Sequence, residues 1–326
     1  MRILLTGSSG FIGYHLAETL LSEGHEVIGV DSLNDYYDPL LKQKRNEALS
    51  AFSKYRFHSF DIAEESALSD LVGTEKPDQI IHLAAQAGVR YSLVNPWAYE
   101  RANTLGTLNV FEAARLHGIK RVVFASSSSV YGKNEKIPFA ESDMTDSPVS
   151  LYAATKKACE LMAHTYHHLY GIEMIGLRFF TVYGPYYRPD MALFRFATKM
   201  LKGESIAIYN HGKMKRDFTF ITDIVSGIKG AMTKKDVGFE VYNLGGDHPV
   251  GLEDVVNMLE AALGVSAKKE YLPMQPGDVV ETYADISKAR AELGFDPKVG
   301  MQEGIQVFAD WFLENREWLL TLKEGR

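Results

Sequence analysis

The sequence of 326 residues contains a single cysteine, Cys159, and so cannot form an internal disulfide. It lacks an apolar run long enough to span a membrane, and the apolar stretch in Met1–Thr6 is too short for a signal peptide. A net charge of -7 and the lack of a Lys/Arg run argue against nucleic acid and anionic membranes as partners. These absences predict a cytoplasmic protein.

The composition is that of an ordinary soluble globular protein, with 46% hydrophobic and 24% charged residues. The sequence shows neither an internal repeat nor a low-complexity linker. Its length exceeds what one hydrophobic core usually serves, which predicts one large domain with a smaller partner.

A strand, a glycine turn and a helix open the chain. Ile3–Leu5 predicts a short buried strand, and the segment Gly7–Gly13 that follows carries three glycines before an amphipathic helix. Such a turn presents free backbone N–H groups at a helix N-terminus, where a pyrophosphate binds. Asp31 ends the next strand about 20 residues on, at a position where a carboxylate accepts the ribose hydroxyls and repels a ribose phosphate. The pattern predicts NAD rather than NADP.

Strands and helices continue to alternate, which predicts a doubly wound parallel sheet in an α/β fold. A cluster of proline and aromatic residues near 180–194 marks where the chain leaves this sheet. The predicted strands cover residues 55–60, 77–85, 121–125, 173–179, 206–209 and 240–246, and the predicted helices include 100–117 and 311–322.

Tyr152 and Lys156 stand four residues apart on a predicted helix and therefore share one face of it. A nearby ammonium favours the phenolate, which is a usable base. By itself this spacing is common on helix surfaces. The preceding strand, however, runs into four serines, Ser126–Ser129, whose hydroxyls emerge where such a sheet binds its ligands. A Ser/Tyr/Lys set is thus predicted.

With this glycine spacing and this Ser/Tyr/Lys set, the chain resembles the extended short-chain dehydrogenase/reductase family, and within it the UDP-glucuronate 4-epimerases. The resemblance extends over nearly the whole chain. The stretches that carry it most specifically are Asp31–Asp38, Ala85–Arg90, Pro148–Tyr152, Arg178–Pro185 and Arg188–Met191.

The resemblance implies the domains and the site. An NAD-binding Rossmann domain would span residues 1–180, with returning pieces near 217–246, and a smaller mixed α/β nucleotide-sugar domain would span 181–326. The implied catalytic residues are Ser127, Tyr152 and Lys156. Tyr152 and Lys156 also belong to the implied cofactor set, which further contains Gly7, Gly10, Phe11, Ile12, Gly13, Asp31, Asn34, Asp61, Ile62, Leu83, Ala84, Ala85, Asn103 and Phe179. The implied substrate set is Arg90, Ser127, Ser128, Ser129, Thr181, Arg188, Tyr209, Arg216 and Asp278.

The serine run also bears on the reaction. Related dehydratases and decarboxylases carry acidic residues where this chain has Ser128 or Ser129, and elimination beside a ketone needs such an acid/base pair. Oxidation followed by reduction at the same carbon, which is epimerisation, is therefore expected. The match places Arg188, with Thr181, to receive the carboxylate of UDP-glucuronate; the alternative is that Arg188 caps a loop.

Other interpretations stay open at this point. The substrate could be UDP-glucose, UDP-galactose or a UDP-N-acetyl-hexosamine, or the chain could be a non-catalytic nucleotide-binding protein on the same fold. Gln275 stands where UDP-galactose 4-epimerases usually have arginine, which puts part of their phosphate clamp in doubt. The family usually forms homodimers through helices that correspond to 103–116 and 151–170. His164 and His168 have metal-ligand spacing but lack evident partner ligands, so no metal is predicted.

Overall fold

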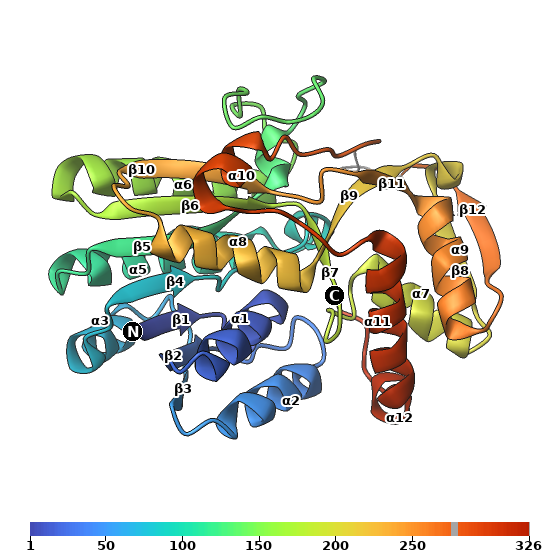
Figure 1. The fold of residues 1–326 in the computed structure, drawn as a ribbon, viewed down its shortest axis with the longest axis horizontal. Helices are drawn as coiled ribbons and strands as arrows, with labels where there is room; N and C mark the ends of the chain where they lie inside the picture. Colours follow the sequence, from blue (N-terminus) through green and yellow to red (C-terminus); the bar gives the residue numbers. More distant parts are fainter. Residues whose placement is uncertain (275–279, 326) are drawn as a thin grey trace.

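The computed structural model describes residues 1–274 and 280–325 (Figure 1). In these ranges, seven parallel strands form the main sheet in the order β10-β6-β5-β4-β1-β2-β3. The order reverses at β1, so the predicted doubly wound sheet is confirmed, and its ligand crevice lies beside β1. The strands are β1 (Arg2–Thr6), β2 (Glu26–Asp31), β3 (Tyr55–Ser59), β4 (Gln79–His82), β5 (Arg121–Ser127), β6 (Glu173–Phe179) and β10 (Phe239–Leu244).

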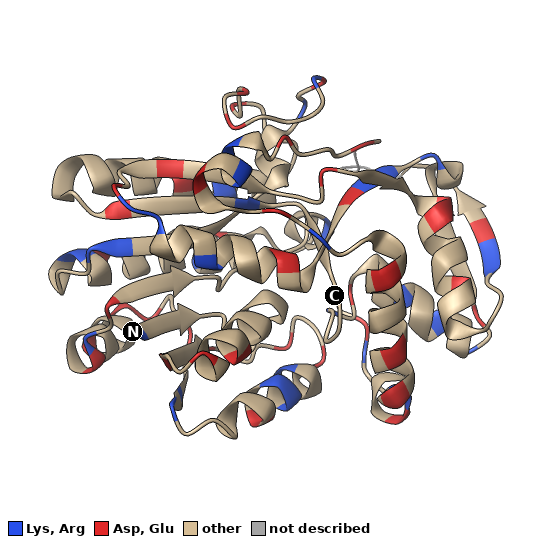
Figure 2. Cartoon of the chain, viewed as in Figure 1, with Lys and Arg blue, Asp and Glu red and all other residues tan. Residues whose placement is uncertain are grey.

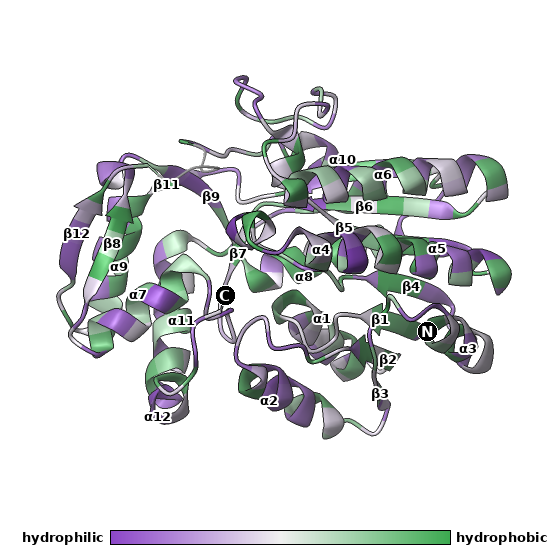
Figure 3. Ribbon diagram, turned by 180° about the vertical axis from the view of Figure 1, so that it is seen from behind, coloured by the Kyte–Doolittle hydropathy of each residue, from purple (hydrophilic) through white to green (hydrophobic). Residues whose placement is uncertain are grey.

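Helices cover both faces of this sheet (Figure 1). One face is covered by α3 (Glu65–Glu75), α5 (Gly106–Leu116) and α6 (Leu151–Tyr170), and the other by α1 (Phe11–Ser22), α2 (Pro39–Ser50) and α8 (Ile221–Thr233). The strands between these layers are mostly hydrophobic, as the green of β1 and β6 in Figure 3 shows, and their buried side chains belong to two core clusters. Burial on two faces is the usual condition of a parallel sheet and explains the near-continuous apolar runs of the sequence.

The outer strand β10 joins the sheet from far along the chain. It pairs with β6 from Phe239 opposite Met174 to Leu244 opposite Phe179. The preceding helix α8 packs against α1. Segments 221–233 and 239–244 therefore belong to the layer formed by the first part of the chain, whereas the domain boundary at residue 180 stays a prediction.

The second part of the chain forms two small sheets with their own helices (Figure 1). In one sheet β9 (Lys215–Phe220) lies between β7 (Thr181–Tyr183) and β11 (Pro249–Gly251), and in the other β8 (Ser205–Tyr209) pairs with β12 (Lys268–Leu272). The accompanying helices are α7 (Ala192–Leu201), α9 (Leu252–Leu263) and α11 (Met301–Glu314), whereas α10 (Ser287–Leu293) packs back against β10 and α8 of the main layer.

Two predicted helices differ from those observed. The expected helix 100–117 is preceded by α4 (Pro96–Tyr99), capped by the side chain of Asn95, and its first part, Glu100–Leu105, is π-helical before α5 begins. Proline at a first helical position behind an asparagine cap explains this earlier start.

The expected helix 311–322 is wrong, because α11 ends at Glu314 and the short α12 (Arg316–Leu319) follows. Between them, Asn315 donates its side-chain amide to the carbonyl of Trp311 and accepts a hydrogen bond from the Trp318 indole. Such side-chain bonds compete with the regular helix pattern.

Charges of both signs are interspersed over the described chain (Figure 2). Within residues 1–274 and 280–325, no helix combines the length and apolar character needed to cross a bilayer.

Candidate active site

A cavity of about 690 Å³ opens at the carboxyl ends of the main-sheet strands, beside the reversal of strand order. Its wall includes the glycine turn after β1, Asp31 at the end of β2, Ser127 at the end of β5 and Phe179 at the end of β6. Thr181 and Arg216, from β7 and β9, line it from the second part of the chain. The cavity is thus lined by residues of both the predicted cofactor set and the predicted substrate set.

The glycine turn brings the start of α1 close to β4. Gly7 has a φ of +74°, and a Cβ there would lie 2.7 Å from the backbone nitrogen of Ala84. A Cβ on Gly13 would lie 2.0 Å from the carbonyl oxygen of Gly7. Helix α1 starts at Phe11 without a side-chain cap, so its first N–H groups remain available to an anion.

Asp31 supports this turn and also faces the cavity. One carboxylate oxygen accepts the backbone N–H of Ser9 at 3.2 Å, and the other accepts that of Leu33 at 2.9 Å. The side chain is therefore held by the backbone on both sides and has a fixed direction. A fixed carboxylate at the end of β2 is what recognition of a ribose diol requires.

Most of the predicted cofactor residues line the cavity. Those brought together there are Gly7, Gly10, Phe11, Ile12, Gly13, Asp31, Asn34, Asp61, Ile62, Leu83, Ala84, Ala85, Tyr152, Lys156 and Phe179. Sequence reasoning missed Lys42 and Arg101. Lys42 donates to the side chain and the carbonyl of Asn34, and burial lowers the pKa of its ammonium to about 8. Arg101 pairs with Asp61 at 2.8 Å. Neither belongs to a local motif that would have revealed it.

Asn103 does not line the cavity, in contrast to its predicted place at the cofactor. Its side chain is fully buried, donates to the carbonyl of Gln86 and the hydroxyl of Thr155, and accepts the N–H of Gln86. It therefore joins the loop after β4 to helix α6. These partners come from distant segments, so the sequence alone could not assign them.

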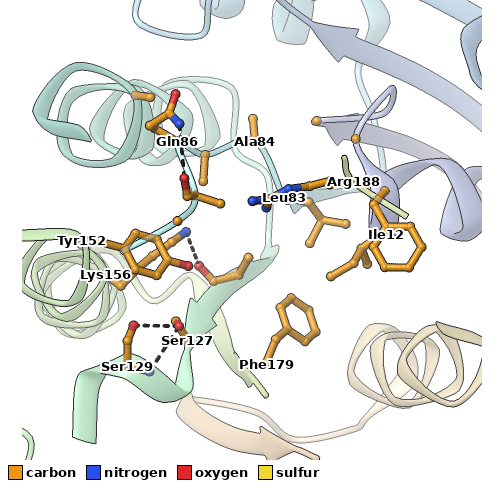
Figure 4. Close-up of a pocket in the computed structure, with 18 of the residues that line it drawn as sticks. Ile12, Leu83, Ala84, Gln86, Ser127, Ser129, Tyr152, Lys156, Phe179 and Arg188 are labelled. Atoms are coloured by element: carbon orange, nitrogen blue, oxygen red, sulfur yellow. Dashed lines mark hydrogen bonds between the residues drawn. The ribbon is translucent and has the colours of Figure 1, made fainter. Parts of the chain in front are cut away.

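The three predicted catalytic side chains meet in this cavity (Figure 4). Ser127 ends β5, whereas Tyr152 and Lys156 lie in the first turns of α6, which is capped by the hydroxyl of Ser150. The Lys156 ammonium donates to the carbonyl of Ala125 at 2.8 Å, which ties α6 to β5. The Tyr152 ring packs edge-on against Tyr99 with its hydroxyl directed into the cavity. A base, a cation and a hydroxyl donor thus surround one space.

Ser128 and Ser129 form a short turn directly after Ser127, and both line the cavity. The Ser129 hydroxyl donates to the Ser127 hydroxyl at 2.8 Å. This part of the wall is therefore made of hydroxyl groups, without a carboxylate at either position.

Arg188 also lines the cavity, but it is paired within the chain. Its Nε and one terminal nitrogen contact the two carboxylate oxygens of Asp190 at 2.9 and 2.5 Å, and the guanidinium lies 5.9 Å from the centre of the Tyr36 ring. Burial works against the charged form, yet the Asp190 carboxylate raises the pKa of Arg188 above its ordinary value. The arginine is held at the wall as a permanent cation.

Only some of the predicted substrate residues line the cavity. Ser127, Ser128, Ser129, Thr181, Arg188 and Arg216 lie in the cavity wall. Arg90 and Tyr209 lie outside the lining and contact each other, with 5.2 Å from the guanidinium carbon to the ring centre. Asp278, together with the rest of the Gln275–Asp278 loop, lies outside the described residues.

Of the three neighbouring histidines of α6, two contact other parts of the chain and the third, His168, is exposed. His164 packs edge-on against Phe239, and Nδ1 of His167 lies 3.0 Å from the carbonyl of Ile172. Among the residues that the structure describes, no group of three His, Cys, Asp or Glu side chains is arranged to hold a metal ion.

A doubly wound sheet with this glycine turn and a Ser/Tyr/Lys set at its carboxyl edge defines a dinucleotide-dependent enzyme of the short-chain dehydrogenase/reductase type. The chain belongs to the NAD dependent epimerase/dehydratase family, whose profile matches residues 3–245.

Two relatives resemble the chain over nearly its whole length. The UDP-glucuronate 4-epimerase of Thermodesulfobacterium geofontis is 44% identical, covering 98% of both chains. The crystal structure of the UDP-glucuronic acid 4-epimerase from Bacillus cereus, in complex with UDP-glucuronic acid and NAD, superimposes with a TM-score of 0.91 at 35% identity and covers 97% of this chain and 100% of that one.

A third relative has a different substrate in its name. The UDP-glucose 4-epimerase of Thermotoga maritima, solved with UDP-glucose, gives a TM-score of 0.87 at 29% identity over 97% of this chain and 100% of that one. The overall fold is therefore shared by epimerases of charged and neutral sugars, so the choice of sugar has to be argued from the site.

Proposed function

We propose that this chain catalyses the NAD-dependent 4-epimerisation of a UDP-sugar, interconverting UDP-glucuronate and UDP-galacturonate. The proposal rests on one observation. The same cavity holds the glycine turn with Asp31 at one end, Ser127, Tyr152 and Lys156 along its wall, and Arg216 on the side of the second part of the chain. A cofactor and a nucleotide sugar can therefore meet beside the Ser/Tyr/Lys set.

The residues at the cofactor end fit NAD. Gly7 lies so close to Ala84 that only a residue without a side chain fits there, and a pyrophosphate could approach the backbone of this turn directly. Asp31 offers a fixed carboxylate to a ribose diol. NAD held by these residues would supply the hydride acceptor for carbon 4 of the sugar and then the hydride donor for the opposite face of that carbon.

The chain's own residues handle the proton. Tyr152, as the phenolate, accepts the proton of the sugar 4-hydroxyl as the carbon is oxidised and gives it back as the ketone is reduced. Ser127 donates a hydrogen bond to the same oxygen, and Lys156, held by the carbonyl of Ala125, supplies the neighbouring positive charge. Because Ser128 and Ser129 provide no acid/base pair, the ketone is reduced again rather than losing water.

The acidic sugar is proposed because a buried arginine stands in the wall. Arg188 is a permanent cation in the same cavity lining as Thr181 and Met191, and a planar carboxylate is the anion that a guanidinium recognises best. The oxidised sugar would be a β-keto acid that loses carbon dioxide readily. An arginine that holds the carboxylate out of line with the ketone would suppress that loss.

The pairing of Arg188 with Asp190 favours the second candidate, a 4-epimerase of a neutral UDP-sugar. Two of the guanidinium nitrogens already contact Asp190, so less of the group remains for a ligand. In that case the arginine would only shape the loop 185–191.

Incubation of the purified protein with UDP-glucuronate, UDP-glucose and UDP-N-acetylglucosamine tests these candidates. We expect UDP-galacturonate from the first, together with NAD that stays bound and no free NADH in solution. Turnover of only the neutral sugars would overturn the acidic substrate. Accumulation of free NADH would instead indicate an ordinary dehydrogenase.

We also propose a cytoplasmic homodimer formed through α5 and α6. These helices pack side by side, and they expose four leucines, Leu108, Leu116, Leu161 and Leu169. A second copy would cover this apolar face. Sedimentation should show a dimer, and Leu161→Glu should shift it to monomer, whereas Gln43→Glu at an exposed position of α2, on the opposite face of the sheet, should not.

A further inference from the structure

A buried ion pair lies directly behind the candidate catalytic residues. Glu160, one turn after Lys156 on α6, is 2% exposed, and Arg178 near the end of β6 is 3% exposed. Arg178 donates from Nε and a terminal nitrogen to the two carboxylate oxygens at 2.8 and 2.9 Å. Although burial opposes the charge, these bonds keep the pKa of Glu160 below its ordinary value.

This pair holds the residue next to the predicted catalytic serine. The Ser126 hydroxyl donates to Glu160 at 2.7 Å, and Ser126 lies opposite Arg178 in the register of β5 and β6. Ser127 follows immediately. The distance between Ser127 and the helix that carries Tyr152 is therefore fixed by a hydrogen bond one residue away.

The same pair also holds the serine turn. The remaining terminal nitrogen of Arg178 donates to the hydroxyl of Tyr131 at 3.0 Å, and Tyr131 ends the turn that contains Ser128 and Ser129. The Tyr131 hydroxyl in turn donates to Asn243 at the end of β10, 2.7 Å away. One guanidinium thus links α6, β5 and the serine turn, and reaches β10 through Tyr131.

Stability alone does not account for this arrangement. Two charges taken out of water regain little net stability from their attraction, and apolar residues of similar volume often serve as well or better. What apolar side chains cannot provide is a set of directed bonds that fixes several segments to one another. Of the segments joined here, α6, β5 and the serine turn each carry a residue proposed to act on the sugar.

We propose that Glu160 and Arg178 are positioning residues for the epimerisation, which set the distance of Ser127 and Tyr152 from the reacting oxygen. This inference rests on the proposed function. A misplacement of about 1 Å costs on the order of 100-fold in rate, so loss of the pair should lower kcat by about 10- to 100-fold. KM for the UDP-sugar should change little, because neither side chain belongs to the proposed substrate set.

The test is a double variant, Glu160→Met with Arg178→Met, which leaves no unpaired buried charge. A control is available on the same two strands. Arg121 and Glu173 pair at 2.7 Å at the opposite, amino ends of β5 and β6, and Arg121→Met with Glu173→Met makes the same chemical change there. Melting temperature, kcat, KM and amide hydrogen exchange of residues 126–131 are measured for both variants.

We expect the Glu160/Arg178 variant to fold, to keep its KM and to lose kcat, with faster exchange in 126–131, while the control keeps its kcat. A folded Glu160/Arg178 variant with the parent's kcat and exchange would overturn the proposal. If this variant does not fold, Ser126→Ala decides, because it removes one bond to Glu160 and should still lower kcat without raising KM.

Failure of the proposed function is distinguishable from failure of this inference. If the parent protein turned over no UDP-sugar, the proposed function would fall, and the exchange of 126–131 in Ser126→Ala against the parent would still decide whether the pair holds the turn. Unchanged exchange there would overturn the positioning role.

Discussion

The Ser129 hydroxyl donates to the Ser127 hydroxyl across 2.8 Å, and the backbone N–H of Ser129 points to the same oxygen at 3.2 Å. Both bonds use lone pairs of Ser127, so its own proton is left to be donated into the cavity. A hydroxyl aimed in this way suits a sugar oxygen on which negative charge develops during oxidation.

Replacing these serines should therefore separate a direct from an indirect effect. Ser127→Ala removes the donor and is expected to lower kcat by about 100-fold or more, the loss usually seen for one such donor. Ser129→Ala removes only the hydrogen bond that orients the Ser127 hydroxyl, so it should lower kcat by less. Steady-state kinetics on UDP-glucuronate measures both, with Ser205→Ala at the exposed first residue of β8 as the control. Equal losses in the two variants would contradict the assigned direction of the bond.

Tyr152→Phe should abolish turnover while leaving the binding of NAD and UDP-sugar intact. The change removes the base but keeps the ring that packs against Tyr99. General acid–base groups contribute about 100- to 10,000-fold, so kcat should fall by at least the lower figure. Calorimetric titration with UDP-glucuronate measures binding beside the rate assay. Substantial remaining turnover would show that another group takes the proton.

Arg188→Ala should affect the acidic substrate more than the neutral one if the arginine receives the sugar carboxylate. The same change leaves the mostly buried Asp190 with the Tyr36 hydroxyl as its remaining side-chain partner. Breaking a fully buried pair costs about 3–5 kcal/mol, so the melting temperature should fall by less than that figure implies. Turnover of UDP-glucuronate and UDP-glucose is therefore compared as a ratio, together with release of a UDP-4-keto-pentose.

The matched control for that experiment is Asp190→Asn, which keeps Arg188 and a hydrogen-bonding neighbour. It should preserve or increase the preference for UDP-glucuronate, because the guanidinium is then less neutralised. An unchanged substrate ratio in Arg188→Ala, without release of a keto-pentose, would contradict a carboxylate clamp.

Acid should destabilise the protein through its buried histidines. Burial lowers the pKa of His82 to about 3 and that of His15 to about 4, below the ordinary value of 6.5. Between these values the unfolded chain binds protons that the folded chain excludes, so stability is present above pH 6.5 and is lost as the pH falls toward 4. The slope is about 1.4 kcal/mol per pH unit for each histidine at most.

Urea unfolding at pH 7 and pH 5 measures this effect. Hydroxyls of Thr6 and Thr107 flank His82, and His82→Gln keeps an amide for them. The variant should reduce the stability difference between the two pH values by about 1–2 kcal/mol. Equal pH dependence in His82→Gln and the parent would contradict a neutral buried His82.

The sequence predicts those parts of the site that depend on the spacing of residues close together in the chain. Each of these patterns lies within a short stretch of the chain. They are the glycines at 7, 10 and 13, the carboxylate at the end of the next strand, and the phenol four residues from an ammonium. The position of Asp31 at the cavity follows in the same way, since a parallel sheet brings its carboxyl ends to one edge.

The contacts that the sequence could not predict join distant segments. Ser126, Glu160 and Arg178 lie on three different elements. The register of β5 and β6 brings Ser126 opposite Arg178, and the packing of α6 on these strands adds Glu160. The partners of the Asn103 amide, Gln86 and Thr155, likewise come from other segments of the chain. The sequence also did not reveal where a side chain competes with the backbone hydrogen bonds of a helix, as Asn315 does at the end of α11.

The late arrival of β10 has a consequence for how the protein is made. A ribosome completes β6 well before residues 239–244 emerge, so the growing chain carries an open sheet edge for that interval. Such an edge invites pairing with a neighbouring chain and aggregation. Truncation before β10 should therefore give an insoluble fragment even though the glycine turn and the Ser/Tyr/Lys set would all be present in it.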